Sequence, residues 1–219
     1  MTIKHLMTGY FIAAVLLLSG CAGKVRYPNY YTLATAPTKQ PATNAHQSGT
    51  VAVRRFETPA YLRQGRIVYR QTPEEVGFYD YHRWAADPGV VVTAGLIDSL
   101  RSSNLFAFVE PYDGHDSHDY VVSGRLERLD ELDYNGGVQV EVKLSAQLVN
   151  VRTGASVWAG AVTQTSSINT RNVNSVVVAM STATQAGIDQ LVADMEKHLA
   201  TTSMAAGNPG TPMVEMNRQ

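Results

Sequence analysis

Five consecutive residues, from His115 to Asp119, concentrate side chains that could do chemistry. They read His-Asp-Ser-His-Asp, and imidazole and carboxylate groups are common ligands of transition metals. A serine beside a histidine and an aspartate also has the composition of a nucleophilic triad. Triad members usually converge from separate elements, however, and the Gly-x-Ser-x-Gly motif does not occur in the sequence. We therefore expect a solvated loop, with no catalytic residue, metal ligand or cofactor-binding residue, and a protein that is not an enzyme.

A second chemical feature is Cys21, the single cysteine of this 219-residue sequence, which excludes an intramolecular disulfide. Ahead of it, Lys4 provides a positive start and Phe11–Leu18 a short apolar run, which is the layout of a secretory signal. This run is well short of the roughly 20 apolar residues that a transmembrane helix needs. We therefore expect residues 1–20 to be a signal peptide that is removed.

The segment Leu18-Ser19-Gly20-Cys21 resembles the lipobox of bacterial lipoproteins. In that motif the chain is cut before the cysteine, here between Gly20 and Cys21. The thiol then becomes a thioether to diacylglycerol, and the new amine is acylated, for example with palmitate. Each buried CH₂ contributes about 0.8 kcal/mol, so three acyl chains make membrane attachment effectively permanent. The alternative is an ordinary signal peptide that happens to end near a cysteine.

The residues after the cysteine bear on which membrane holds the anchor. An aspartate in the next position tends to retain bacterial lipoproteins in the inner membrane, and this chain has Ala22 there. We therefore expect the periplasmic face of the outer membrane. Sorting rules for the later positions differ among bacteria, so Lys24 leaves the inner membrane open.

Composition sets the class of the remaining chain. The formal net charge is −1, and the 18 basic residues do not cluster as a nucleic-acid surface requires. The 44% apolar content suits one globular domain, which we place at residues 50–200. Residues 21–49 are expected to hold the lipidated N-terminus, a first strand around Tyr30–Leu33 and a flexible segment. Residues 201–219, which contain Pro209 and Pro212, are expected to be a disordered tail.

Strands are predicted where apolar and polar residues alternate or β-branched and aromatic residues gather. The clearest alternation runs over Val138–Leu148 and indicates a half-buried antiparallel strand. Asn135-Gly136 before it offers the positive φ angles of a type I′ hairpin turn. Further strands are predicted at 51–56, 66–70, 76–84, 106–109, 122–127 and 157–162.

Two helices are predicted beside these strands. Asp87 followed by Pro88 is the pattern of an N-cap with proline at the first helical position, and the helix should stop near Asn104. A longer helix should start near Asn172 or Asn174. The elements together predict an α+β fold, a two-layer sandwich in which two helices pack on one face of a largely antiparallel mixed sheet of about six strands. Apolar-face positions of the longer helix are Val177, Met180, Thr184, Ile188, Leu191, Met195 and Leu199.

The aromatic segment around residues 79–84 is the candidate surface for a partner. Tyrosine and tryptophan are enriched at binding hot spots, and they are equally at home in a sheet core. We expect Trp84 to be core. Tyr79 and Tyr81 are the possible partner contacts.

Four sequence blocks occur in a fixed order behind the lipobox. They are Tyr30–Leu33, Pro59–Val68, Tyr81–Trp84 before Pro88, and Thr153–Trp158. In this order they resemble the ABC-type transport auxiliary lipoprotein family, PqiC-like proteins that accompany mammalian-cell-entry (MCE) domain lipid transport systems. The resemblance spans roughly residues 30–199 and carries over no catalytic residue.

The resemblance implies a non-enzymatic accessory component that helps to pass lipids or other hydrophobic molecules across the periplasm. Its implied partners are an MCE-domain protein and the subunits of an ABC-type transporter, and ATP hydrolysis would belong to those subunits. A domain of this size has little room for an enclosed lipid cavity, so a hydrophobic passage would form between subunits or with a partner. A homo-oligomer is therefore also expected. The alternatives are a structural or assembly lipoprotein of the cell envelope and, with less support, a periplasmic hydrolase or metal-binding protein built on the His115 loop.

Overall fold

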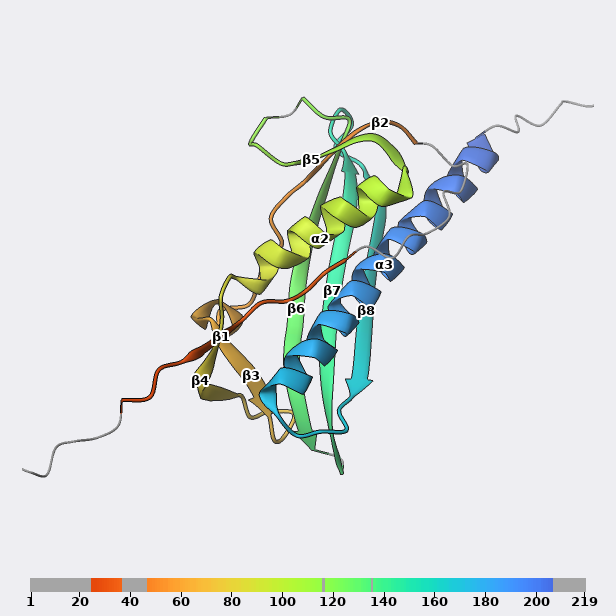
Figure 1. The fold of residues 1–219 in the computed structure, drawn as a ribbon. Helices are drawn as coiled ribbons and strands as arrows, with labels where there is room; N and C mark the ends of the chain where they lie inside the picture. The colour runs from red at the N-terminus through yellow and green to blue at the C-terminus, as the bar shows by residue number, and fades with distance from the viewer. Residues whose placement is uncertain (1–24, 37–46, 116, 135, 207–219) are drawn as a thin grey trace, which may run out of the picture.

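The computed structural model describes residues 25–36, 47–115, 117–134 and 136–206, and they form one sheet covered by two helices (Figure 1). Within these ranges no helix is long and apolar enough to cross a membrane. The strands are β1 (Asn29–Tyr31), β2 (Gln47–Val53), β3 (Arg66–Arg70), β4 (Gly77–Trp84), β5 (Phe106–Pro111), β6 (Tyr120–Tyr134), β7 (Gly137–Asn150) and β8 (Ser156–Ser167). The helices are the short 3₁₀ turn η2 (Leu62–Gln64) and the α-helices α2 (Pro88–Ser103) and α3 (Val173–Ala206).

The sheet divides at β6, the longest strand. On one side β6 pairs antiparallel with β7, and β7 pairs antiparallel with β8. On the other side β6 pairs in parallel with two strands at different positions along its length. It pairs with β2 at residues 120–122 and with β3 at residues 130–132. From there β2 leads to β5, and β3 leads through β4 to β1.

The predicted α+β class and its two layers are confirmed, and the sheet is mixed. It has eight strands where about six were expected. The long strands β6, β7 and β8 are antiparallel, whereas the β1, β2 and β3 contacts bring in parallel pairs. Each of the eight strands overlaps a segment that was predicted as a strand, and even the short β1 joins the sheet by pairing with β4, so the expected total of about six was too low.

Both helices lie on the same face of the sheet (Figure 1). At the start of α2 the Asp87 carboxylate accepts a hydrogen bond of 2.8 Å from the Gly89 N–H, and Asn104 ends the helix with φ of 53°. At the start of α3 the Asn172 side chain accepts from the Ser175 N–H at 2.9 Å. These caps confirm the predicted helix starts, because they satisfy N–H groups that have no partner within a helix.

The long helix continues further than expected. All seven predicted apolar-face residues of α3 are buried. The helix runs to Ala206, so the expected start of the tail at residue 201 was too early. Thr201 to Ala206 contains no glycine or proline, and the first such residue is Gly207. Residues 207–219 lie outside the described residues.

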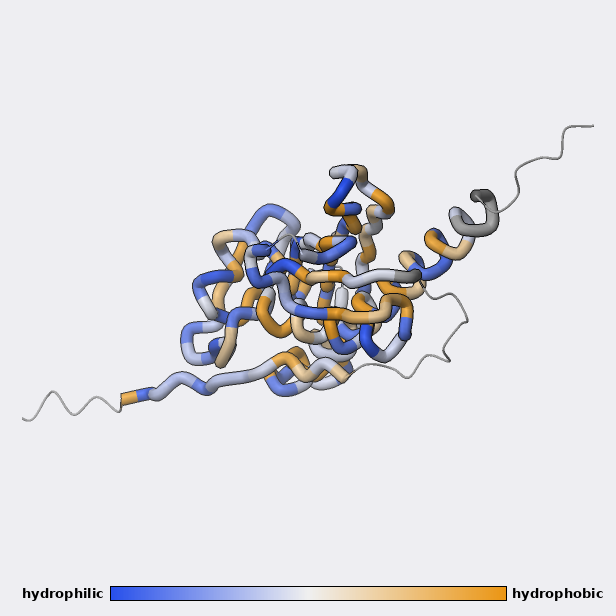
Figure 2. The backbone as a smooth tube through the Cα atoms, turned by 90° about the horizontal axis from the view of Figure 1, so that it is seen from above, coloured by the Kyte–Doolittle hydropathy of each residue, from blue (hydrophilic) through white to orange (hydrophobic). Residues whose placement is uncertain are grey.

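The helix-facing row of β7 forms the centre of the core. Val140, Val142, Leu144 and Leu148 are almost completely buried, as the alternation predicted. Leu144 packs so closely on α3 that a Cβ atom at Gly187 would stand 3.1 Å from it. The hydrophobic stretches of the chain accordingly gather in the interior, as the view from above shows (Figure 2).

The segment after β1 fastens the N-terminal part of the domain to both helices. Leu33 is 3% exposed, and the Ala34 N–H donates to the Ser181 hydroxyl of α3 at 3.1 Å. On the other side Thr35 lies against Gly95 of α2. This segment passes over the helices in Figure 1, so the predicted first strand is an integral part of the fold.

Candidate functional site

Gly20 and Cys21, the predicted cleavage and lipidation positions, lie outside the described residues. The described chain begins at Val25, four residues after the cysteine, and enters β1 at Asn29. β1 pairs with the last part of β4, with Tyr30 opposite Arg83 and Tyr31 opposite Trp84. The part of β4 that follows Tyr81 therefore lies beside β1, the first described strand after Cys21.

Tyr79 and Tyr81 have different environments although they are only two residues apart. The register of β4 against β3 shifts between Phe78 and Arg83, so the two side chains do not share a face. Tyr81 is 43% exposed, and the Arg26 guanidinium lies 5.6 Å from its ring centre. Tyr79 is half-buried, and its hydroxyl donates to Glu131 at 2.8 Å. Tyr79 is therefore less accessible than Tyr81, and its role as a partner contact remains a prediction. Trp84 is 5% exposed and belongs to the core, as predicted.

Tyr79 is the centre of an aromatic cluster that reaches the first strand. Its ring makes edge contacts with Tyr69 and with His82, at 5.2 and 5.6 Å between ring centres. His82 Nδ1 in turn lies 2.8 Å from the Tyr31 hydroxyl of β1. A continuous set of contacts thus joins Glu131 on β6 to Tyr31 on β1.

Glu131 is a carboxylate in an apolar setting, 3% exposed beside Val140 of β7. Burial raises its pKa, and the Tyr79 hydrogen bond opposes that rise. Burial and the hydrogen bond to Glu131 also raise the pKa of Tyr79, so its hydroxyl stays protonated and donates.

Asp130 occupies the opposite side of β6 and has a cationic partner. It is fully buried, and Arg70 Nε donates to it at 2.5 Å. Arg70 also donates to the Pro73 carbonyl at 3.0 Å and lies near the ring of Tyr61. Burial, followed by the charge of Asp130, raises the pKa of Tyr61 to about 12. Burial likewise raises the pKa of Asp130, against the opposing effect of Arg70.

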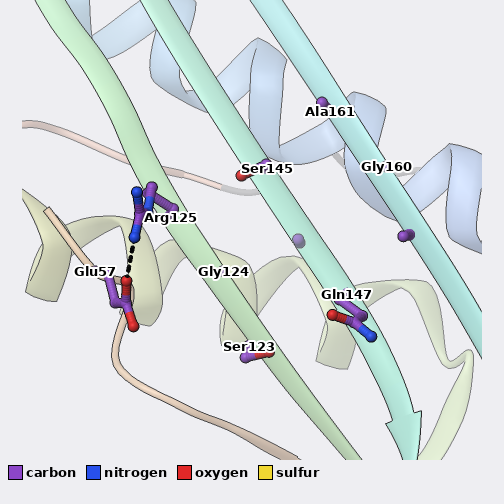
Figure 3. Close-up of a pocket in the computed structure, with 10 residues that line it drawn as sticks. Glu57, Ser123, Gly124, Arg125, Ser145, Gln147, Gly160 and Ala161 are labelled. Atoms are coloured by element: carbon purple, nitrogen blue, oxygen red, sulfur yellow. Dashed lines mark hydrogen bonds and ion pairs between the residues drawn. The ribbon is translucent and has the colours of Figure 1, made fainter. Parts of the chain in front are cut away.

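A depression of about 560 Å³ lies on the face of the sheet that the helices leave open (Figure 3). Its floor is a block of small residues in register, with Gly124, Ala146 and Gly160 on neighbouring strands. The charged pair Arg125–Glu57, at 2.7 Å, lies at its side. This depression was not predicted from the sequence, because the small residues come together only through the register of three strands. Beside these small residues, the lining includes the hydroxyl groups of Ser123 and Ser145 and the amide group of Gln147.

The His115 loop separates its two histidines. His115 is exposed, with Nδ1 3.2 Å from Asp113. His118 points inward: its side chain is 7% exposed, with Nε2 3.4 Å from Glu110 and Nδ1 without a hydrogen-bond partner in the structure. The expected solvated loop therefore holds for His115 and was wrong for His118. Over the described residues, which leave out Asp116, no group of three or more His, Cys, Asp or Glu is placed to hold a metal.

Comparison with known proteins identifies a family for most of this chain. Residues 31–205 match the family model described as the ABC-type transport auxiliary lipoprotein component. No curated protein sequence matches.

Solved structures with a similar fold include protein XCC0632 from Xanthomonas campestris. It is 18% identical, with a TM-score of 0.71, over 80% of this chain and 99% of that one. An uncharacterized protein covers the same shares of the two chains at 14% identity and a TM-score of 0.58. PelC from Paraburkholderia phytofirmans, described as a dodecamer, is 20% identical over 73% of this chain and 93% of its own, with a TM-score of 0.45. At these identities the similarity concerns the fold.

Proposed function

Because the chain belongs to the ABC-type transport auxiliary lipoprotein family, we propose that it is a non-enzymatic accessory component of a lipid transport system. The observation that carries this proposal is the family match over residues 31–205, directly behind a lipobox at Leu18–Cys21. The family description supports an association with a transport system. The finer statement, that the partners are an MCE-domain protein and ABC-type transporter subunits, is our proposal.

We propose further that Cys21 is the membrane anchor, with cleavage between Gly20 and Cys21 and the domain on the periplasmic face of the outer membrane. The fold suits this arrangement, because the chain enters the domain at β1, within a few residues of the cysteine. The open face of the sheet then remains available for protein partners.

Crosslinking in intact cells, followed by purification through this chain, tests the proposed partnership. Recovery of an MCE-domain protein together with transporter subunits is the expected result. Recovery of the chain alone, or with envelope proteins unrelated to transport, contradicts the proposal and favours a structural or assembly role.

Labelling with radioactive palmitate tests the anchor. The chain should take up label, and the Cys21→Ala variant should not. A variant that is still processed and bound to the membrane after a carbonate wash contradicts lipidation at this residue.

A further inference from the structure

The exposed aromatic side chains of this protein are concentrated where the chain leaves the anchor. Among the described residues seven large hydrophobic side chains are exposed, and four of them lie on or beside β1 and β4: Val25, Tyr27, Tyr30 and Tyr81, with exposed fractions of 69%, 81%, 64% and 43%. We call Tyr27, Tyr30 and Tyr81 the tyrosine patch. A soluble surface rarely gathers large apolar side chains without a partner to cover them.

Arginines accompany these tyrosines. Arg26 lies over the Tyr81 ring, and Arg83 stands opposite Tyr30 in the β1–β4 pairing. Arg66, which pairs with Arg83 in the β3–β4 register, adds a third guanidinium. One carboxylate, that of Asp80, lies beside these arginines, 3.9 Å from Arg66. This corner of the molecule is thus locally positive, although the whole chain carries a formal net charge of −1.

Tyrosine and arginine together are the side chains that suit a membrane–water interface. Tyrosine places an apolar ring at the level of the headgroups while its hydroxyl remains hydrated, and arginine binds the phosphate groups of lipids. Basic groups are also attracted to the surface of a membrane that contains anionic lipid. The chemistry of the patch therefore matches a bilayer that contains anionic phospholipid.

The length of chain outside the described structure limits how far the patch can be from the membrane. Four residues separate Cys21 from Val25, and a fully extended chain covers at most about 3.6 Å per residue. The first described residue is then within about 15 Å of the lipidated cysteine. The patch begins at Tyr27, six residues after Cys21, so this tyrosine is within about 22 Å of the lipidated cysteine. The bilayer that holds the acyl chains is therefore a large apolar partner within reach of the patch.

From these observations we infer that the tyrosine patch, with Arg26 and Arg83, lies on the surface of the anchoring membrane and fixes how the domain stands on it. The inference rests on the proposed lipidation of Cys21. It turns β1 and β4 toward the lipid headgroups and leaves β5, at the other end of the sheet, pointing away (Figure 1).

Fluorescence quenching by brominated lipid tests this orientation. The lipidated full chain is reconstituted into vesicles of phosphatidylethanolamine and phosphatidylglycerol, with or without brominated acyl chains. Tyr30→Trp and Tyr81→Trp each introduce an indole at the patch. Phe108→Trp, at a site on β5 that is 65% exposed, is the matched control. The native Trp84 and Trp158 are about 5% and 6% exposed and provide a constant background.

The indoles at positions 30 and 81 should lose fluorescence in the brominated vesicles, and the indole at position 108 should not. The double variant Arg26→Ser/Arg83→Ser should reduce the quenching at position 81 when phosphatidylglycerol is present. Arg152→Ser, which changes an exposed arginine in the β7–β8 turn, should leave it unchanged.

Mass spectrometry of the same samples separates the two proposals. If Cys21 carries its acyl chains and positions 30 and 81 are quenched no more than position 108, the membrane-facing patch is wrong while the anchor stands. If Cys21 is unmodified, the anchor is wrong, and the inference that rests on it falls as well.

Discussion

Asp130 and Glu131 are consecutive residues of β6 and are equally buried, yet they face opposite sides of the sheet and are stabilised differently. Asp130 lies against the Arg70 guanidinium, which partly compensates its charge. Glu131 lies among aromatic rings, and the hydrogen bond that the structure gives it comes from the neutral Tyr79 hydroxyl. A buried carboxylate that is paired with a cation acts mainly as a structural element. For a buried acid that is held by one hydroxyl, the contribution to stability depends on whether the acid is protonated.

The difference also concerns what each residue is connected to. Asp130 connects β6 to β3, within the centre of the sheet. Glu131 connects through Tyr79 and His82 to Tyr31 on β1, the strand that follows the proposed anchor. A change in the charge of Glu131 is therefore expected to act, through these contacts, on the strand that follows the proposed anchor.

The largest effect should come from breaking the paired site. Asp130→Ala leaves the buried Arg70 guanidinium without its counter-charge, and the loss of one partner from a buried pair costs about 3–5 kcal/mol of unfolding free energy. Urea denaturation of the purified chain measures this loss.

The matched control is Glu57→Ala, which removes the carboxylate of another pair between β6 and its neighbouring segment. Both members of that pair, Arg125 and Glu57, are exposed, at 59% and 71% of their side chains. Its loss should cost at most about 1 kcal/mol. Equal costs for the two variants would mean that burial does not distinguish the pairs.

A smaller effect is expected from the aromatic side of the comparison. Tyr79→Phe removes the donor to the Glu131 carboxylate and leaves a buried acceptor without its partner, which costs about 1–3 kcal/mol at neutral pH. Tyr69→Phe removes a hydroxyl from the neighbouring ring without touching that bond, and it should cost less. The same urea titrations measure both variants, and an equal loss in the two would show that the hydrogen bond to Glu131 contributes nothing specific.

This pair of sites shows what could be predicted from the sequence. The strand β7 was predicted over nearly its full length because one face is buried throughout, so alternation is visible in the residue types. The strand β6 was predicted only to Glu127, although it continues to Tyr134. A register shift after Leu126 interrupts the alternation there, and the following residues are mostly charged.

The burial of Asp130 and Glu131 could not be predicted either, because it depends on residues that are distant in the sequence. The charged residues of β6 are buried because Arg70 and Tyr79, more than fifty residues earlier, supply their partners. Tyr79 and Tyr81 were both named as possible partner contacts, and of the two it is Tyr81 that is exposed. Tyr79 was not separated from it, because a register shift within β4 leaves no mark in the residue types.

The most delicate test of the comparison is the pH dependence of stability with and without the Glu131 carboxyl group. The pKa of Glu131 in the folded protein is raised by burial above its ordinary value of about 4.3. Between these two values the folded chain binds more protons than the unfolded chain, so this residue makes stability fall as the pH rises. Glu131→Gln keeps an oxygen that accepts from Tyr79 and removes the titration. The unfolding free energy of the variant, measured relative to wild type by urea titration from pH 4 upward, should therefore increase as the pH rises.

Glu127→Gln on the same strand is the control of opposite sign. A hydrogen bond from Lys143 lowers the pKa of Glu127, so the contribution of this residue to stability is greatest above its ordinary pKa. If the wild-type and Glu131→Gln curves run parallel, the Tyr79 hydrogen bond must fully offset burial, and the two neighbouring carboxylates would be equally well compensated by a phenol and by a guanidinium.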